Sequence, residues 1–160
     1  MFTFQIFTVF LIGLIFGSFA NVCIARLPKD KTVIFGRSNC PKCKKKIFWY
    51  DNIPLISFIL LGGKCRQCNK KISVNYFFVE LISGIFFILI YLYTNNYFDF
   101  VLINLILFFF LIIFFIDLKH FIIPDILNFS LIFLGLLKNF IPIKNLNFNY
   151  DIEQSIIGGV

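Results

Sequence analysis

Long apolar segments separated by short polar ones make up most of this chain. A transmembrane helix needs about 20 apolar residues to cross about 30 Å of hydrocarbon. Four segments approach that length, at about 2–24, 76–93, 98–116 and 126–141, and a further apolar segment begins at Ser155. The pattern therefore predicts an all-α polytopic membrane protein with about four complete transmembrane helices. The first segment is read as a retained span, because no basic residue precedes Arg26 and no small-residue cleavage site follows it.

The segment 26–76 interrupts this pattern with a basic loop. It carries 12 of the 15 Lys and Arg residues, against only Asp30 and Asp51. Since basic loops stay on the cytoplasmic side, we expect the loop and the later Asp117–Asp125 turn to share the cytoplasmic face of the membrane. The net charge of +7 is explained by this loop, so it does not indicate nucleic-acid binding.

The composition supports this organisation. The chain is 59% hydrophobic and contains 25 Phe, which excludes an ordinary soluble domain. We predict three units: a first transmembrane helix at 1–25, a basic loop domain at 26–76, and the beginning of a membrane domain at 77–160. Small residues in the first helix predict close approach by a neighbouring helix; they are Gly13, Gly17, Ser18 and Ala20.

Four cysteines in the basic loop form two Cys-x-x-Cys pairs, Cys40 with Cys43 and Cys65 with Cys68. Each pair delivers two sulfur ligands from one turn, which suits a tetrahedral metal site. In a reducing compartment a metal site is favoured over two disulfides. We predict structural zinc, with iron as the weaker alternative, because four protein ligands leave no open position for catalysis. The fifth cysteine, Cys23, is read as a small apolar residue in the first helix.

An apolar stretch separates the two pairs. Leu55, Ile56, Phe58 and Ile59 form it, after an aromatic pair at Trp49 and Tyr50. Trp and Tyr are enriched at the headgroup level of membranes. The pattern therefore indicates that this part of the loop lies in the membrane interface.

Three acidic residues near the ends of predicted helices are candidates for chemistry. Asp117 ends the third apolar segment, so it either marks a membrane boundary or reacts there. Two close carboxylates can share a proton, one acting as base on water and the other as acid, but Asp125 is about 12 Å away along a helix and Pro124 interrupts that helix. Glu80 is either a snorkelling residue or a functional one. His120 is read as a solvated turn residue.

Several motifs occur together in one order from about residue 13 to 125. The segment Gly17-Ser18-Phe19-Ala20-Asn21-Val22, followed by Arg26-Leu27-Pro28, resembles the opening signature of the type IV prepilin peptidases. Several further segments resemble that family's cytoplasmic domain. They are the cysteine pairs, Asn52-Ile53-Pro54-Leu55, Gly62-Gly63-Lys64-Cys65, Tyr76 and Val79-Glu80-Leu81. Ile116-Asp117 and Ile123-Pro124-Asp125 resemble the segment that holds its first catalytic aspartate.

The resemblance implies a membrane aspartyl endopeptidase. Members remove the basic leader of prepilins and pseudopilins at the cytoplasmic face, for type IV pilus assembly or type II secretion, and many then methylate the new N-terminus with S-adenosylmethionine. Asp117 matches the first catalytic aspartate, and Asp125 and Glu80 are candidate supporting residues. The family's second aspartate lies in a Gly-x-Gly-Asp motif, which this sequence lacks. We therefore expect the N-terminal part of a longer or truncated peptidase, inactive by itself.

Two other functions fit parts of the sequence. The chain is alternatively a catalytically inactive, membrane-anchored zinc-binding module that acts in pilin assembly. A methyltransferase without protease activity is a further alternative, although no Gly-rich dinucleotide-binding turn supports it.

Overall fold

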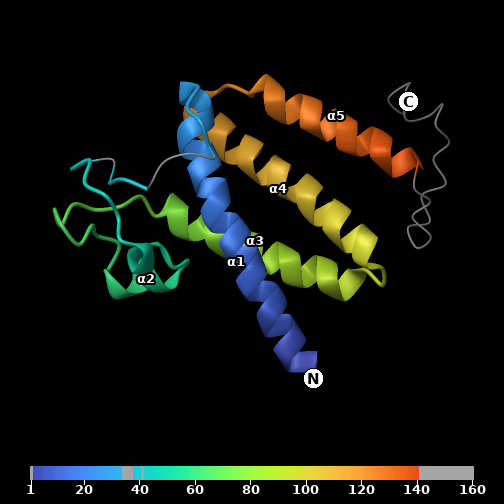
Figure 1. Cartoon of the computed structure of the whole chain (residues 1–160), viewed down its shortest axis with the longest axis horizontal. Helices are drawn as coiled ribbons and strands as arrows, with labels where there is room; N and C mark the ends of the chain where they lie inside the picture. The colour runs from blue at the N-terminus through green and yellow to red at the C-terminus, as the bar shows by residue number, and fades with distance from the viewer. Residues whose placement is uncertain (1, 34–37, 41, 141–160) are drawn as a thin grey trace.

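The computed structural model describes residues 2–33, 38–40 and 42–140 (Figure 1). Within these ranges the chain is helical, and its only extended pairings are two isolated bridges, Asn39 with Lys46 and Lys64 with Lys71. The elements in chain order are α1 Phe2–Arg26, η1 Leu27–Lys29, η2 Trp49–Asn52, α2 Ile56–Leu60, α3 Asn75–Tyr93, α4 Tyr97–His120 and α5 Asp125–Phe140. The predicted all-α architecture is confirmed.

Three of the described helices are long and apolar enough to cross a membrane. They are α1, α3 and α4, whereas α5 is apolar but has only 16 residues. The prediction of about four spans is therefore approximately right, with three long helices and one shorter one. The end of the predicted fourth span at 141, and the apolar segment from Ser155, lie outside the described residues.

Helices α1 and α3 cross at close range because glycines line their contact. A Cβ atom added to Gly13 would lie 2.8 Å from the Cα of Gly84, and one added to Gly17 would lie 2.6 Å from the Cα of Glu80. Side chains join the helices at the same contact, where the Ser83 hydroxyl donates to the Gly13 carbonyl at 2.8 Å. Small residues permit such approach between membrane helices, so the expected role of Gly13 and Gly17 is confirmed.

A larger side chain at this contact should loosen the helix pair. We expect Gly17→Val to lower the stability of the full-length protein in detergent by about 1–3 kcal/mol, the usual cost of overpacking. The matched control is Gly135→Ala in α5, where an added Cβ meets no atom within 4 Å. A midpoint of thermal unfolding that is unchanged by Gly17→Val would contradict the tight packing.

The buried core lies where α1, α3, α4 and α5 meet. Its members are Ala20, Cys23, Val79, Phe108, Leu111, Ile112, Ile116 and Leu127. Cys23 is one of them, so its interpretation as a small apolar residue is consistent with the packing. Ile116 is fully buried, and it therefore ties the last turns of α4 to the last turns of α1.

The third helix ends later than the sequence predicts. The apolar pattern places its end at Ile116, but α4 continues to His120. It stops where Phe121 adopts a left-handed conformation with φ of 52° and donates its N–H to the Asp117 carbonyl. Glycine usually occupies this position, so Phe121 gives no sequence signal for the end. Asp117 consequently lies within the final helical turn.

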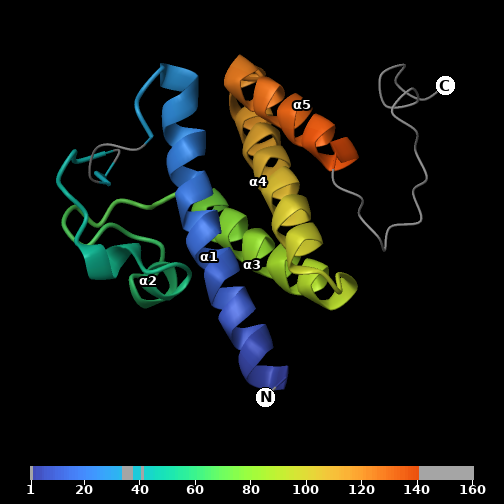
Figure 2. The same cartoon turned by 45° about the vertical axis from the view of Figure 1, so that its right-hand side comes forward.

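Helices α1 and α4 end on the same side of the bundle (Figures 1 and 2). The loop between α1 and α3 leaves from that side, since it starts where α1 ends. The structure thus brings the cysteine loop and the Asp117 turn to one end of the bundle, as the alternation of spans predicts. Which side of the membrane this end faces stays a prediction.

Candidate functional site

The two cysteine pairs lie in two turns with the same backbone hydrogen bonds. In the first turn the N–H of Cys40 donates to the Lys45 carbonyl and the N–H of Lys44 donates to the Cys40 carbonyl. In the second turn Cys65 pairs with Lys70, and Asn69 with Cys65, in the same manner. Both turns close through a left-handed residue, Lys44 with φ of 58° and Asn69 with φ of 52°. Each turn therefore holds its two thiols on one side.

The four sulfur atoms converge on one point. The thiols of Cys40, Cys43, Cys65 and Cys68 all lie within 4.8 Å of one another, and the Cys40 and Cys68 sulfurs are 3.9 Å apart. Four sulfurs around a zinc ion, at about 2.3 Å from it, would be separated by about 3.8 Å. The donor set and its spacing therefore fit a tetrahedral tetrathiolate site. All five cysteines are free, so no disulfide occupies the four thiols of the cluster.

The electrostatics of the cluster favour a thiolate at one position. Burial acts to raise the pKa of the Cys40 thiol, but hydrogen bonds from the backbone N–H groups of Cys43 and Lys42, and from neighbouring thiols, lower it to about 7. A hydrogen bond from the backbone of Lys70 lowers the pKa of Cys68, but burial and the other three thiols together raise it to about 11. Since the metal ligand is the thiolate, the backbone N–H groups of the first turn favour the form of the cluster that binds a metal ion.

An ion pair fastens the second cysteine turn to the rest of the loop. Arg66, between the two cysteines, donates through Nε and Nη2 to both carboxylate oxygens of Asp51, at 2.7–3.1 Å. The Asp51 side chain is only 8% exposed, and the Arg66 guanidinium also lies over the Tyr50 ring at 5.5 Å. The bidentate geometry fixes the orientation of the turn as well as its position.

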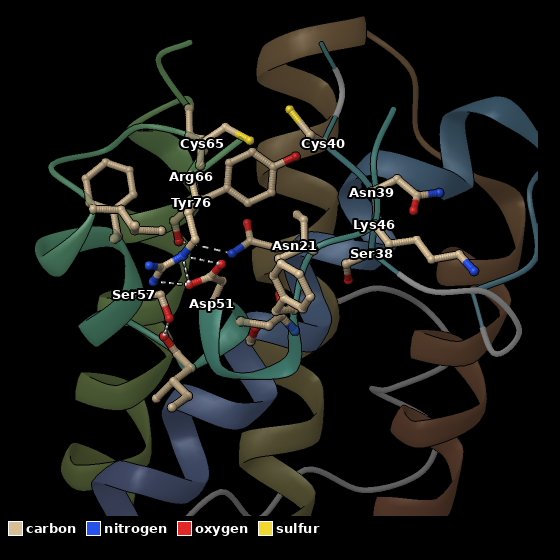
Figure 3. Close-up of a pocket in the computed structure, with 18 of the residues that line it drawn as sticks. Asn21, Ser38, Asn39, Cys40, Lys46, Asp51, Ser57, Cys65, Arg66 and Tyr76 are labelled. Atoms are coloured by element: carbon tan, nitrogen blue, oxygen red, sulfur yellow. Dashed lines mark hydrogen bonds and ion pairs between the residues drawn. The ribbon is translucent and has the colours of Figure 1, made fainter. Parts of the chain in front are cut away.

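A cavity of about 210 Å³ lies between this loop, the last turns of α1 and the first turns of α3. Figure 3 shows the sulfurs of Cys40 and Cys65 turned toward each other at its edge, with the Asp51–Arg66 pair beside them. Polar groups from all three elements line it, among them Asn21, Tyr76 and Glu80. The amide of Asn21 donates to the Tyr76 carbonyl at 3.0 Å, which joins the helices at the cavity.

Glu80 lines this cavity and holds the loop. It is 9% exposed, and its Oε2 accepts a hydrogen bond of 2.9 Å from the backbone N–H of Leu55. Leu55 has a positive φ of 57°, which is rare for a branched residue. The carboxylate therefore supports a backbone conformation that the chain would otherwise avoid. The hydrogen bond joins two residues that are 25 positions apart in the sequence.

Two substitutions of Glu80 distinguish a structural role of its hydrogen bond to Leu55 from a chemical role of its carboxylate. Glu80→Ala should leave the Leu55 N–H buried without a partner, at a cost of about 1–3 kcal/mol, and should make the loop more sensitive to limited proteolysis. Glu80→Gln retains an acceptor oxygen and should preserve the loop. If Glu80→Gln keeps an intact loop but abolishes the activity of the full-length protein, the carboxylate has a chemical role that the hydrogen bond alone does not explain.

Asp117 and Asp125 lie at the same end of the bundle as the cysteine loop, but the described residues do not pair them. Both are exposed, Asp117 in the last turn of α4 and Asp125 at the start of α5. Within the described ranges the only salt bridge is that of Arg66 with Asp51, and the acidic residues form no cluster of three metal-ligating groups. The structure thus assembles the four cysteines, whereas among the described residues Asp117 belongs to no such cluster of three or more metal-ligating groups.

Two buried polar residues in α4 were not singled out from the sequence. Asp99 is 4% exposed and accepts a hydrogen bond from the Asn96 amide at 3.3 Å. Asn104 is equally buried; its amide donates to the Phe100 carbonyl, and its Oδ1 has no partner among the described residues. Burying a polar residue inside a membrane helix costs free energy. The presence of Asp99 and Asn104 in an apolar segment therefore could have marked them as functional or structural residues.

The sequence of this chain is similar to those of several known proteins. The sequence profile described as the bacterial peptidase A24 N-terminal domain matches residues 11–94. A prepilin leader peptidase/N-methyltransferase of Vibrio cholerae is 43% identical over 158 residues, which cover 93% of this chain and 60% of that protein. One of Neisseria gonorrhoeae is 35% identical over 163 residues, covering 84% of the chain and 57% of that protein.

A third similar protein, from Myxococcus xanthus, carries the same name and is 49% identical over 78 residues, which cover 49% of this chain. The chain therefore spans at most about 60% of the length of these relatives. No solved structure matches it significantly.

Proposed function

Because this chain belongs to the bacterial peptidase A24 family through the N-terminal domain of those enzymes, we propose that it is the N-terminal part of a membrane endopeptidase that removes the leader of prepilins or pseudopilins. The observation that carries the proposal is the similarity to a prepilin leader peptidase/N-methyltransferase along 93% of the chain. The arrangement of the helices supports it, since the cysteine loop and Asp117 lie at one end of the bundle.

In the proposed mechanism Asp117 provides one of two catalytic carboxylates. One carboxylate, ionised, accepts a proton from a water molecule that attacks the scissile carbonyl, and the other, protonated, donates to the carbonyl oxygen. The resulting tetrahedral intermediate collapses when its hydroxyl proton returns to the second carboxylate, the C–N bond breaks, and the first carboxyl gives its proton to the leaving nitrogen. Asp117 is suitable because it is exposed at the end of a membrane helix, where a substrate segment leaving the bilayer can reach it. The second carboxylate is proposed to come from a part of the full-length protein other than the described residues, with Asp125 and Glu80 supporting the site.

The cysteine cluster is proposed to hold structural zinc. The four thiols of Cys40, Cys43, Cys65 and Cys68 suit this ion by number and spacing, and they leave it no position for water. Bound zinc would supply folding free energy to a loop that has little apolar core of its own. The two turns would then be fixed relative to each other and to the cavity beside them.

Methylation of the new N-terminus, with S-adenosylmethionine as donor, is proposed as the second activity. The relatives carry this activity in their names. The cavity next to the cysteine cluster is the candidate donor site by its position alone, since its lining is basic, with Arg26, Lys45, Lys46 and Arg66 against Asp51 and Glu80, and Asp51 is already paired with Arg66. The chemistry of transfer would belong to the methylsulfonium group of the donor.

The proposed location is the bacterial inner membrane, with the cysteine loop and Asp117 in the cytoplasm. The basic loop supports this orientation through the positive-inside rule and through attraction to anionic lipids. The partners are then prepilins, or pseudopilins of type II secretion, and membrane lipid.

The test uses the full-length protein in vesicles with a leader-bearing prepilin. Mass spectrometry should detect a shortened substrate, and a methylated one when S-adenosylmethionine is added, and Asp117→Asn should stop the shortening. If the full-length protein with its metal bound neither shortens nor methylates any prepilin, the inactive zinc-binding module becomes the better interpretation.

A further inference from the structure

The short helix α2 carries an apolar stripe that no described part of the chain covers. Ile56, Ile59 and Leu60 are 53%, 65% and 78% exposed, and their spacing of three and four places them on one helix face. The opposite face is held by the protein: the Ser57 hydroxyl donates to the carbonyls of Tyr50 and Ile53. The stripe therefore points outward because the other side of α2 is fixed.

The position of α2 places this stripe beside the membrane-spanning helices. The residue before α2, Leu55, donates its backbone N–H to the Glu80 carboxylate. Glu80 lies four residues after Tyr76, which is about 6 Å further along α3. Next to it the Phe58 ring lies 5.5 Å from the Phe77 ring of α3. In both overall views α2 lies level with the middle of α1 and not beyond its end (Figures 1 and 2).

The surface of α3 next to α2 is also apolar and open. Val74, just before α3, and Phe78 in its first turn are 52% and 48% exposed, and exposed apolar residues continue along α3 at Ile85, Leu89 and Leu92. A spanning helix presents such a stripe to lipid. The α2 stripe is therefore an extension of a lipid-facing surface at its cysteine-loop end.

The backbone N–H groups around α2 are hydrogen-bonded within the protein, as a water-free environment requires. The N–H groups of Leu55, Ile56, Ser57, Ile59, Leu61, Gly62, Gly63 and Lys64 all donate to acceptors within the protein. The chain turns sharply on either side of the helix, at Leu55 before it and at Gly62 and Gly63 after it, all with positive φ. Non-helical backbone at membrane depth requires such internal satisfaction.

The charge pattern agrees with this placement. Between Lys46 and Lys64, in the most basic part of the chain, the only charged residue is Asp51, and it is paired with Arg66. Trp49, at 80% exposure, lies near the start of this stretch, and Trp is common at membrane interfaces.

We propose that α2 is a re-entrant element, whose stripe of Ile56, Ile59 and Leu60 inserts into the lipid acyl chains of the leaflet that surrounds the start of α3. The cysteine loop is then anchored in the bilayer at its centre as well as at its two ends. This inference concerns membrane contact alone and holds whatever the loop's catalytic role is.

The experiment measures the contact of single tryptophans with lipid. In the full-length protein, Trp49 and any tryptophan outside this chain are replaced by Phe, and Leu60→Trp is compared with Lys70→Trp, an exposed position on the second cysteine turn. In vesicles of phosphatidylethanolamine and phosphatidylglycerol with brominated acyl chains, Trp at position 60 should be quenched several-fold more than Trp at position 70. Aqueous acrylamide should quench in the opposite order.

Metal content verifies folding of each variant, and Ile59→Trp serves as a second reporter if Leu60→Trp fails to fold. Equal acrylamide quenching at positions 60 and 70 would overturn the proposal. A photoreactive benzoylphenylalanine at position 60 identifies the occupant in membranes: a lipid adduct supports insertion, whereas an adduct with a second copy of the protein or with prepilin would overturn it.

Discussion

Replacing Asp117 by Asn should abolish leader cleavage by the full-length protein while leaving its metal content and membrane insertion unchanged. Asn retains the shape of the side chain but cannot take up or release a proton in the working pH range. Positioned general acids and bases contribute about 10²–10⁴-fold to rates, so the loss should be at least about 10²-fold. Initial rates of prepilin shortening, followed by mass spectrometry, measure it.

Two further variants show whether the effect belongs to Asp117. Asp30→Asn alters an exposed carboxylate of the cysteine loop at a left-handed residue, a conformation that Asn tolerates, and it should leave the rate unchanged. Asp125→Asn should reduce the rate less than Asp117→Asn if Asp125 only supports the site. Normal cleavage by the Asp117→Asn protein would remove this residue from the mechanism.

Replacing Cys65 by Ser should release the metal and unfold the loop between α1 and α3. The change removes one of four thiolates from a cluster whose closed geometry depends on all of them, and apparent zinc binding at structural sites is worth about 10–16 kcal/mol. Zinc measured by atomic emission should fall from about one ion per chain toward zero. Limited proteolysis should then cut the loop while the helices remain protected.

The matched control is Cys23→Ala, which removes the one cysteine outside the cluster. Cys23 is buried in the helical core, so this variant should retain its metal, with only a modest loss of stability. The effect of Cys65→Ser on cleavage should be smaller than that of Asp117→Asn if the loop serves folding or methylation. Full zinc retention by Cys65→Ser would mean that the four thiols do not form the binding site.

Features with a strong local pattern were predictable from the sequence. Length and hydropathy identified the spans, because a bilayer imposes a minimum apolar length on any helix that crosses it. The cysteine cluster was predictable because the two pairs share one spacing, and four thiols are the number that one tetrahedral ion takes. The close approach at Gly13 and Gly17 followed from residue size alone.

Features that depend on distant contacts were not predictable. The role of Glu80 was left open because its partner is a backbone N–H at Leu55, which has no side-chain signature. The extension of α4 past Asp117 was missed because Phe121, not glycine, terminates it. A partner for Asp117 could not be predicted either, since the only nearby carboxylate in the sequence, Asp125, lies beyond Pro124 at the start of the next helix.

The register of α1 against α3 has a consequence for how the sequence can change in length. Gly13 meets Gly84, Gly17 meets Glu80, and Asn21 meets Tyr76, so each step of one turn along α1 is matched by one turn along α3. A single-residue deletion between Gly13 and Asn21 would rotate the last turns of α1 by about 100° and separate them from the cysteine loop. Insertions that natural variants of this protein tolerate should therefore fall outside the segment from Gly13 to Asn21.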